Sequence, residues 1–147
     1  MGNEIVNAVI NYHLSIPNSK EEVEVRGYLG SISEIEERDL CVIFSNLVQN
    51  AKEATQRLKE EEREILIEVK RGRNFIYGRI ENTFSRKENQ KGGHRFTTKR
   101  GKEDHGFGID NVKQCVEKYV GIMEISICGN RYITQFRLPC KGENFQL

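Results

Sequence analysis

The apolar pattern of residues 39–60 constrains the fold of this 147-residue chain more than any other feature. Apolar side chains recur at offsets of three, four, seven and eleven residues, on Leu40, Ile43, Phe44, Leu47, Ala51, Ala54 and Leu58. In a helix this spacing produces one continuous apolar face. We therefore predict an amphipathic helix over 39–60 whose apolar face packs against another layer of secondary structure.

Two β-hairpins are predicted elsewhere in the chain. Apolar residues alternate over 65–69, and a short polar link leads to a second strand over 75–80. Toward the C-terminus, strands over 122–128 and 132–138 turn around Gly129-Asn130. Because the strands of each pair are adjacent in sequence, the sheet should be mostly antiparallel.

Glycines mark both ends of a second helix. It begins at Gly106-Phe107-Gly108, its buried face continues to Tyr119, and Gly121 is predicted as the C′ residue just past its end. At the N-terminus we expect a helix over 2–14 and an extended piece over 23–28. Together these elements predict the α+β class, with helices on one face of a mixed, mostly antiparallel sheet.

The composition excludes several classes of protein. Charged residues make up 31% and hydrophobic residues 37%, which indicates a globular chain. A net charge of +1 argues against a dedicated nucleic-acid partner. There is no apolar run long enough to span a membrane, and the first residues do not resemble a signal peptide. The four cysteines form no C-x-x-C pair, so we expect reduced core thiols in a cytosolic protein.

A polar ridge runs along the border of the apolar face of the long helix. It comprises Asn46, Asn50, Glu53 and Arg57, which align at about 100° per residue. Asparagine is a poor helix former, so two of them in mid-helix call for an explanation. Their side-chain oxygens suit Mg²⁺ that keeps its waters and phosphate ligands. The alternative is that these side chains satisfy neighbouring backbone groups.

The segment 84–105 breaks the regular pattern and has the length of a functional lid. It is rich in glycine, hydroxyl and basic residues: Thr97, Thr98, Lys99, Arg100, Lys102 and His105. It leads into Gly106 and Gly108, where glycines and the free N–H groups of a helix start favour a phosphate. This arrangement suits a polyphosphate, and a solvated charged loop is the alternative.

Two motifs in order then resemble a known superfamily. Residues 46–54, Asn-Leu-Val-Gln-Asn-Ala-Lys-Glu-Ala, look like the N-box of the ATP-binding superfamily of gyrases, heat-shock chaperones, histidine kinases and mismatch-repair ATPases. Residues 105–112, His-Gly-Phe-Gly-Ile-Asp-Asn-Val, look like its second glycine box. The resemblance implies a Bergerat-type two-layer α/β sandwich with a long ATP lid, and ATP and Mg²⁺ as ligands.

Within that superfamily the chain is most similar to sensor histidine kinases of the peptide-quorum-sensing class. There the boxes read N-L-x-x-N-A-x-E-A and H-G-x-G-L-x-N-V, with T-T/S-K between them, as at Thr97-Thr98-Lys99. Residues 2–8 also resemble the segment that joins the dimerisation helices to the catalytic domain. The resemblance divides the chain into a linker helix and first extended segment (1–30), a catalytic domain (31–140) and a tail (141–147).

This resemblance implies a two-component kinase that donates the γ-phosphate of ATP to a His on a separate dimerisation domain, and through it to a response regulator. The chain would be the cytoplasmic end of a membrane-anchored receptor, with no membrane contact of its own. None of His13, His94 and His105 is followed by an acidic residue, as an acceptor usually is. The acceptor is therefore expected upstream of this chain.

Site residues follow from the same match. Asn50 would hold Mg²⁺ and Asn46 would support it, while Thr98, Lys99, His105 and the amides of Gly106 and Gly108 would hold phosphates. Glu53 also belongs to the matched box, and we interpret it as a partner of a nearby Lys or Arg.

The adenine box departs from the superfamily pattern. Its usual D-x-G-x-G reads Glu81-Asn82-Thr83-Phe84-Ser85 here. Asn82 is the candidate adenine contact through its carbonyl oxygen, and Glu81 is the alternative if the strand register differs by one. Two other functions stay open: an anti-sigma-type serine kinase, and a degenerate nucleotide-binding interaction module. Hydrolytic members and anti-sigma kinases carry a Glu base where Asn46 stands, which speaks against the first of these.

Overall fold

The computed structural model describes residues 22–27, 34–85 and 106–140, together with Asn7 and Asn11, which are helical. The rest of the helix expected over 2–14, most of the lid and the tail over 141–147 lie outside the described residues. So do Thr98, Lys99 and His105 of the expected phosphate site.

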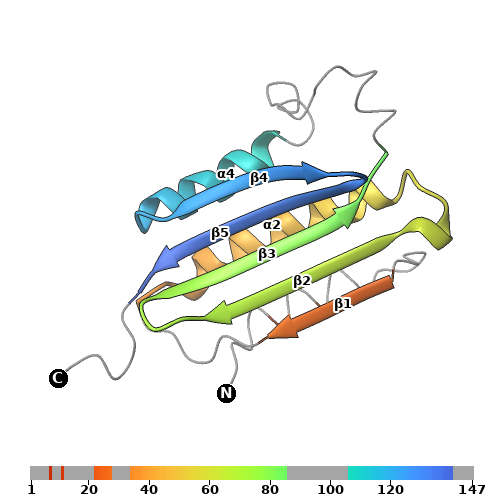
Figure 1. Cartoon of the computed structure of the whole chain (residues 1–147). Coiled ribbons are helices and arrows are strands. Elements are labelled where there is room, and N and C mark those ends of the chain that lie inside the picture. The colour runs from red at the N-terminus through yellow and green to blue at the C-terminus, as the bar shows by residue number, and fades with distance from the viewer. Residues whose placement is uncertain (1–6, 8–10, 12–21, 28–33, 86–105, 141–147) are drawn as a thin grey trace.

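Five strands form a single sheet in the order β1-β2-β3-β5-β4 (Figure 1). The elements in chain order are β1 (Glu22–Gly27), α2 (Glu37–Thr55), a 3₁₀ turn (Glu60–Glu62), β2 (Glu64–Arg71), β3 (Phe75–Thr83), α4 (Gly106–Lys118), β4 (Ile122–Cys128) and β5 (Arg131–Pro139). Among the described strands, β1 and β2 pair in parallel and the other pairs are antiparallel. Helices α2 and α4 lie on one face of the sheet, which confirms the predicted class.

The core lies between this helical layer and the sheet. The apolar stripe of α2 contributes most of its helical half, and alternate residues of β2 and β3 contribute the sheet half. Phe44 of α2 and Phe136 of β5 meet edge to face, with ring centroids 5.6 Å apart. Gly78 makes room for this pair, because a Cβ there would lie 2.3 Å from the Phe136 ring. A side chain at position 78 would thus displace the centre of the core.

The long helix is shorter than predicted, since it covers Glu37–Thr55 rather than 39–60. Its C-cap is Gln56, and Arg57 and Leu58 lie in the turn that follows. The Nε of Arg63 donates to the Leu58 carbonyl oxygen (3.0 Å) and fixes this turn. The chain must reverse direction here to enter β2. The helix therefore ends at Thr55, although the apolar spacing continues to Leu58. Arg57 therefore does not continue the polar ridge on α2.

The end of α4 also differs from the prediction by one residue. Val120, not Gly121, takes the left-handed conformation, with φ of 59°. The N–H of Gly121 bonds the Val116 carbonyl oxygen and that of Val120 bonds Glu117, which is the Schellman pattern. Gly121 is needed for space instead, because a Cβ there would lie 2.5 Å from the Arg137 carbonyl oxygen.

The four cysteines are free, as predicted, but they do not all lie in the core. Cys140 is buried and Cys41 and Cys115 are half-buried, whereas Cys128 at the end of β4 is exposed. The prediction of core thiols is therefore wrong for Cys128, because the last residue of an edge strand has no covering layer. In the part of the chain that the structure describes, no helix is long and apolar enough to cross a membrane.

Candidate functional site

The two predicted motifs meet where α2 and α4 touch. Asn46 of α2 faces Gly108 in the first turn of α4, and a Cβ added at Gly108 would lie 3.1 Å from the Asn46 Oδ1 atom. The Nδ2 atom of Asn46 donates to the Val42 carbonyl oxygen of its own helix (2.8 Å). Asn46 therefore satisfies a neighbouring backbone group with its nitrogen and presents its oxygen to the start of α4.

Asn50 lies one helical turn after Asn46 and is half-buried. Within the described residues its side chain makes no hydrogen bond or ion pair. Glu53, one turn further, accepts a hydrogen bond from the Nε2 of Gln49 (2.8 Å). The three box residues thus occupy consecutive turns of α2, and among them Asn50 keeps its side-chain oxygen available for a ligand.

The first turn of α4 suits an anion. Its leading N–H groups have no acceptors within the helix, and the turn contains no acidic residue. Gly106 is the first residue described there, so the backbone amides of Gly106 and Gly108 both belong to this turn. Of the two residues, Gly108 lies beside the Asn46 side chain, as expected if one ligand touches both boxes.

A second contact joins the opposite ends of these helices. Asp39 in the first turn of α2 is only 7% exposed and accepts hydrogen bonds from the Tyr119 hydroxyl and from the Lys118 Nζ (2.9 Å). The Tyr119 hydroxyl in turn accepts from the Glu36 backbone N–H (3.1 Å). We call this cluster the helix latch. Nothing in the sequence pattern identified it, because its members lie about 80 residues apart.

The helix latch determines the protonation of its members. The hydrogen bonds from Tyr119 and Lys118 hold the pKa of Asp39 below its usual value. Burial, with Asp39 beside it, raises the pKa of the Tyr119 hydroxyl. Burial also raises the pKa of the Cys115 thiol, whose Sγ lies 3.8 Å from an Asp39 oxygen. The carboxylate is thus charged while its partners remain protonated near neutral pH.

The end of β3 supplies the candidate adenine contact. Asn82 is 3% exposed and shares the helix-facing side of the sheet with Ile80, and its Nδ2 donates to the Thr83 carbonyl oxygen (2.8 Å). Its Oδ1 is therefore the atom able to accept a hydrogen bond from an amino group. Thr134 of β5, which belongs to none of the sequence motifs, is a second buried polar residue on this face.

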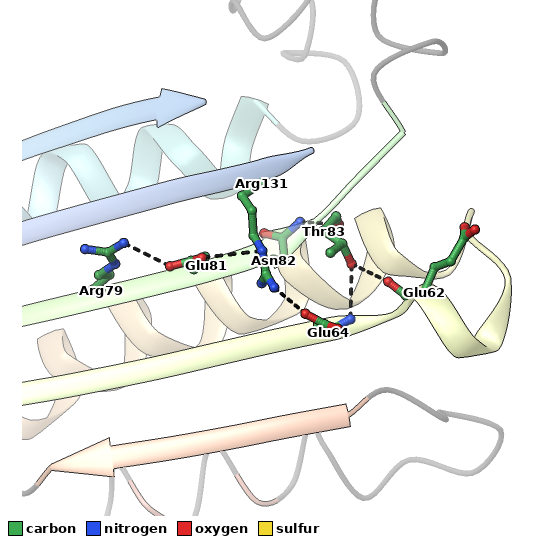
Figure 2. A network of polar contacts seen from close by, with 7 residues as sticks. All are labelled: Glu62, Glu64, Arg79, Glu81, Asn82, Thr83 and Arg131. Atoms are coloured by element: carbon green, nitrogen blue, oxygen red, sulfur yellow. Dashed lines mark hydrogen bonds and ion pairs between the residues drawn. The ribbon is translucent and has the colours of Figure 1, made fainter. Parts of the chain in front are cut away.

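Glu81 lies on the opposite face of the sheet, in the polar network that Figure 2 shows. Its carboxylate pairs with Arg79 (2.9 Å) and Arg131 (3.6 Å), and Arg131 also contacts Glu64. This network stabilises the reverse side of β3 and directs Glu81 away from the helices. Asn82, rather than Glu81, therefore lies on the same side as Asn46 and Gly108.

Thr83 anchors the same strand end. Its Oγ1 donates to the Glu62 carbonyl oxygen (2.8 Å) and accepts from the Glu64 N–H (3.1 Å), as Figure 2 shows. Phe84 follows, and its N–H bonds the Asn130 carbonyl oxygen in the β4–β5 turn (3.0 Å). The backbone beside Asn82 is thus fixed before the chain enters the expected lid.

A metal at this site would depend on amide oxygens and on the ligand itself. In the residues that the structure describes, no three His, Cys, Asp or Glu side chains come together as a metal-binding group. Asn50 fits a cation such as Mg²⁺, which takes one or two protein oxygens and completes its shell with water and phosphate.

Comparison with known proteins identifies the family of this chain. Residues 35–139 match the GHKL domain family. A sequence search of curated proteins gave no match.

Among solved structures, the chain resembles a nucleotide-free catalytic domain of the histidine kinase ThkA, with a TM-score of 0.68, 18% identity and 97% of each chain covered. It also resembles the mycobacterial sensor histidine kinase MprB (TM-score 0.65, 16% identity, 94% of this chain and 95% of that chain). A third match is the Acinetobacter baumannii histidine kinase AdeS (TM-score 0.66, 14% identity, 95% of this chain and 64% of that chain). At these identities the likeness shows the fold.

Proposed function

Because the chain belongs to the GHKL domain family, we propose that it binds Mg·ATP and acts as the catalytic domain of a sensor histidine kinase. The γ-phosphate would pass to a His on a separate dimerisation and phosphoacceptor domain of the same receptor. The observation that carries this proposal is the contact between Asn46 and Gly108. It brings the Asn-bearing face of α2 and the free amides of α4 to one place, where a cation and its phosphates need them.

Each residue of the site has a separate task. Asn50 offers its amide oxygen to Mg²⁺, and Asn46 holds the start of α4 beside it. The backbone amides of Gly106 and Gly108 hold phosphate oxygens, with Thr98, Lys99 and His105 assigned to the same group from the sequence. The Oδ1 atom of Asn82 accepts a hydrogen bond from the adenine amino group. Glu53 lies next to the site on α2, one turn after Asn50. When bound, Mg·ATP supplies the phosphoryl group, so these residues act by positioning and by offsetting charge.

The identity of residue 46 favours transfer over hydrolysis. General-base catalysis needs a side chain that takes a proton near neutral pH, and an amide does not. A kinase whose acceptor is an imidazole does not need this base, because the imidazole is itself the nucleophile. The same argument weakens the anti-sigma-type serine kinase as an alternative.

The finer assignments rest on the sequence resemblance. These are the peptide-quorum-sensing class, a response regulator as the indirect partner, and a cytoplasmic location at the end of a membrane-anchored receptor. One observation favours a different function, that of a degenerate nucleotide-binding interaction module. Residues 81–85 contain neither the Asp nor the glycines of the adenine box.

Calorimetric titration with ATP, with and without Mg²⁺, separates these functions. We expect binding in the micromolar-to-millimolar range for the wild type. Asn50→Ala should lose the Mg²⁺-dependent part of the affinity and phosphotransfer to an added dimerisation helix pair, with its circular dichroism unchanged. Asn74→Ala, an exposed asparagine in the β2–β3 turn, is the matched control. No ATP binding by the wild type would favour the degenerate module, and wild-type transfer by Asn50→Ala would reject the Asn50 assignment.

A further inference from the structure

Strand β4 presents an unusually apolar open edge. Among the strands that the structure describes, it ends the sheet and pairs only with β5, and its seven residues are all exposed or half-buried. Ile122, Ile125 and Ile127 are 63%, 41% and 37% exposed, and Val120 just before the strand is 81% exposed. An edge strand of this kind offers unpaired N–H and C=O groups to another strand.

The opposite edge of the sheet is protected differently. In β1 the exposed Glu24 and Arg26 pair with each other (2.7 Å) and place charges along that edge. Along β4 the only charged residue is Glu124, and the strand contains neither lysine nor proline. Charges and prolines are the usual means by which proteins prevent edge-to-edge association. β4 therefore lacks most of the protection that β1 has.

We propose that β4 pairs antiparallel with β4 of a second copy of this chain, about a two-fold axis at Ile125. This register pairs all seven residues of the strand, with Ile125 opposite itself, Met123 opposite Ile127, and Ile122 opposite Cys128. Directly opposed residues of an antiparallel pair point to the same face, so both helical layers would lie on one side of a continuous sheet. The helix-facing row across the seam is then entirely apolar.

Charge favours this register over its neighbours. With the axis at Ile125, Glu124 lies opposite Ser126. With the axis at Glu124, two carboxylates would face each other directly, which destabilises a strand pair. With the axis at Ser126, Ile122 and Met123 would have no partner within the strand. Self-complementarity about Ile125 is the reason to name a second copy as the partner rather than an unrelated chain.

The test measures mass in solution by light scattering over a range of protein concentrations. A reductant must be present, since Cys128 is exposed. The wild-type chain should shift from 17.0 kDa toward twice that mass as concentration rises. Ile125→Lys and Ile125→Asp should each stay monomeric, because each would oppose two like charges at the axis. An equimolar mixture of the two variants should associate again, since Lys then faces Asp.

Val25→Lys is the matched control, because Val25 is 49% exposed on the other edge strand. It should dimerise like the wild type. A wild type that is monomeric at every concentration would reject the proposal, as would dimers of Ile125→Lys. A mixture that stays monomeric would reject the two-fold register at Ile125.

Discussion

Asn46 uses the two ends of its amide for different contacts. Its nitrogen bonds the Val42 carbonyl oxygen and its oxygen faces Gly108. The sequence left two interpretations of the polar ridge, ligand contact and backbone bonding, and this residue shows that backbone bonding holds for its nitrogen. An amide has a donor and an acceptor, so its nitrogen can bond the backbone while its oxygen stays available, and residue spacing alone does not show this.

Gly108→Ala should weaken ATP binding without weakening the fold. The added methyl would lie 3.1 Å from the Asn46 Oδ1, so the start of α4 must move by a few tenths of an ångström. We expect a loss of about tenfold in affinity, or about 1.4 kcal/mol. The melting temperature should hold or rise, because alanine favours helix more than glycine does. Gln114→Ala, on the exposed side of α4, is the control, and equal affinities in both variants would contradict the prediction.

Val120→Gly should stabilise the protein. Val120 has φ of 59° and is 81% exposed, so glycine removes backbone strain and loses little packing. The left-handed conformation costs an L-residue about 1–2 kcal/mol, and the greater chain entropy of unfolded glycine offsets about 0.5–1 kcal/mol. We expect a net gain of about 0.5–1 kcal/mol in urea unfolding. Val120→Ala keeps its Cβ and should give no such gain, and an equal gain from both would refute the strain argument.

At the scale of elements, the periodicity of apolar residues predicted the helices and strands whose formation depends on interactions within one segment. The stripe of α2 and the alternation in β2 and β3 are set by burial within each segment. The end of α2 depends on the turn that Arg63 fixes, and the parallel pairing of β1 with β2 joins residues about 42 positions apart. The end of α2 and the β1–β2 pairing depend on residues far apart in the chain, so a short stretch of sequence does not predict them.

Asp39 should make stability depend on pH through the helix latch. Its pKa is lowered in the folded state, so its contribution is complete above the unfolded value near ~3.9 and is lost as pH falls through the folded value. Asp39→Asn should therefore destabilise the chain at pH 7, with a smaller difference from wild type at pH 3. Urea unfolding at both pH values measures this. Asp110→Asn, on the exposed face of α4, is the control.

Tyr119→Phe tests the same latch from the other helix. Removing the hydroxyl leaves the Asp39 carboxylate with Lys118 and the Cys115 thiol, and takes away the acceptor for the Glu36 N–H. Hydrogen bonds to a charged group contribute about 1.5–3 kcal/mol, so a loss of that order is expected in urea unfolding at pH 7. A loss below about 0.5 kcal/mol, the usual range of a surface change, would mean that the latch does not stabilise the helix pair.

At the scale of the whole molecule, the sequence predicted that two motifs lie on helices, but it did not predict their surroundings. The boxes on α2 and α4 were chosen by residue type and order, and the fold brings Asn46 and Gly108 together. The helix latch and Thr134 were missed, because a buried polar residue has no periodic signature until its face is known. The structure also shows that Asn82 and Glu81 point to opposite faces of the sheet. Their adjacent positions in the sequence did not show which of them faces the helices.

The isolated chain should bind ATP yet neither label itself nor hydrolyse ATP appreciably. Self-labelling needs an acceptor His, and His13, His94 and His105 are followed by Leu, Arg and Gly rather than an acidic residue. Hydrolysis needs a base for water, and Asn46 is an amide whose nitrogen is already bonded to Val42. Radiolabelled γ-phosphate measures both reactions, and acid-labile label on the chain would identify an acceptor among the three histidines.

Asn46→Glu provides the converse test, with Asn46→Gln as its matched control. Both side chains are one methylene longer than asparagine and press equally on Gly108, so any structural cost is shared. Only Glu is able to take a proton, and general-base catalysis typically contributes about 10²–10⁴-fold. Hydrolysis by the Glu variant should therefore exceed that of the Gln variant by at least about tenfold, at similar ATP affinity. Equal rates would mean that position 46 does not face the attacking water, and that weak hydrolysis has another cause.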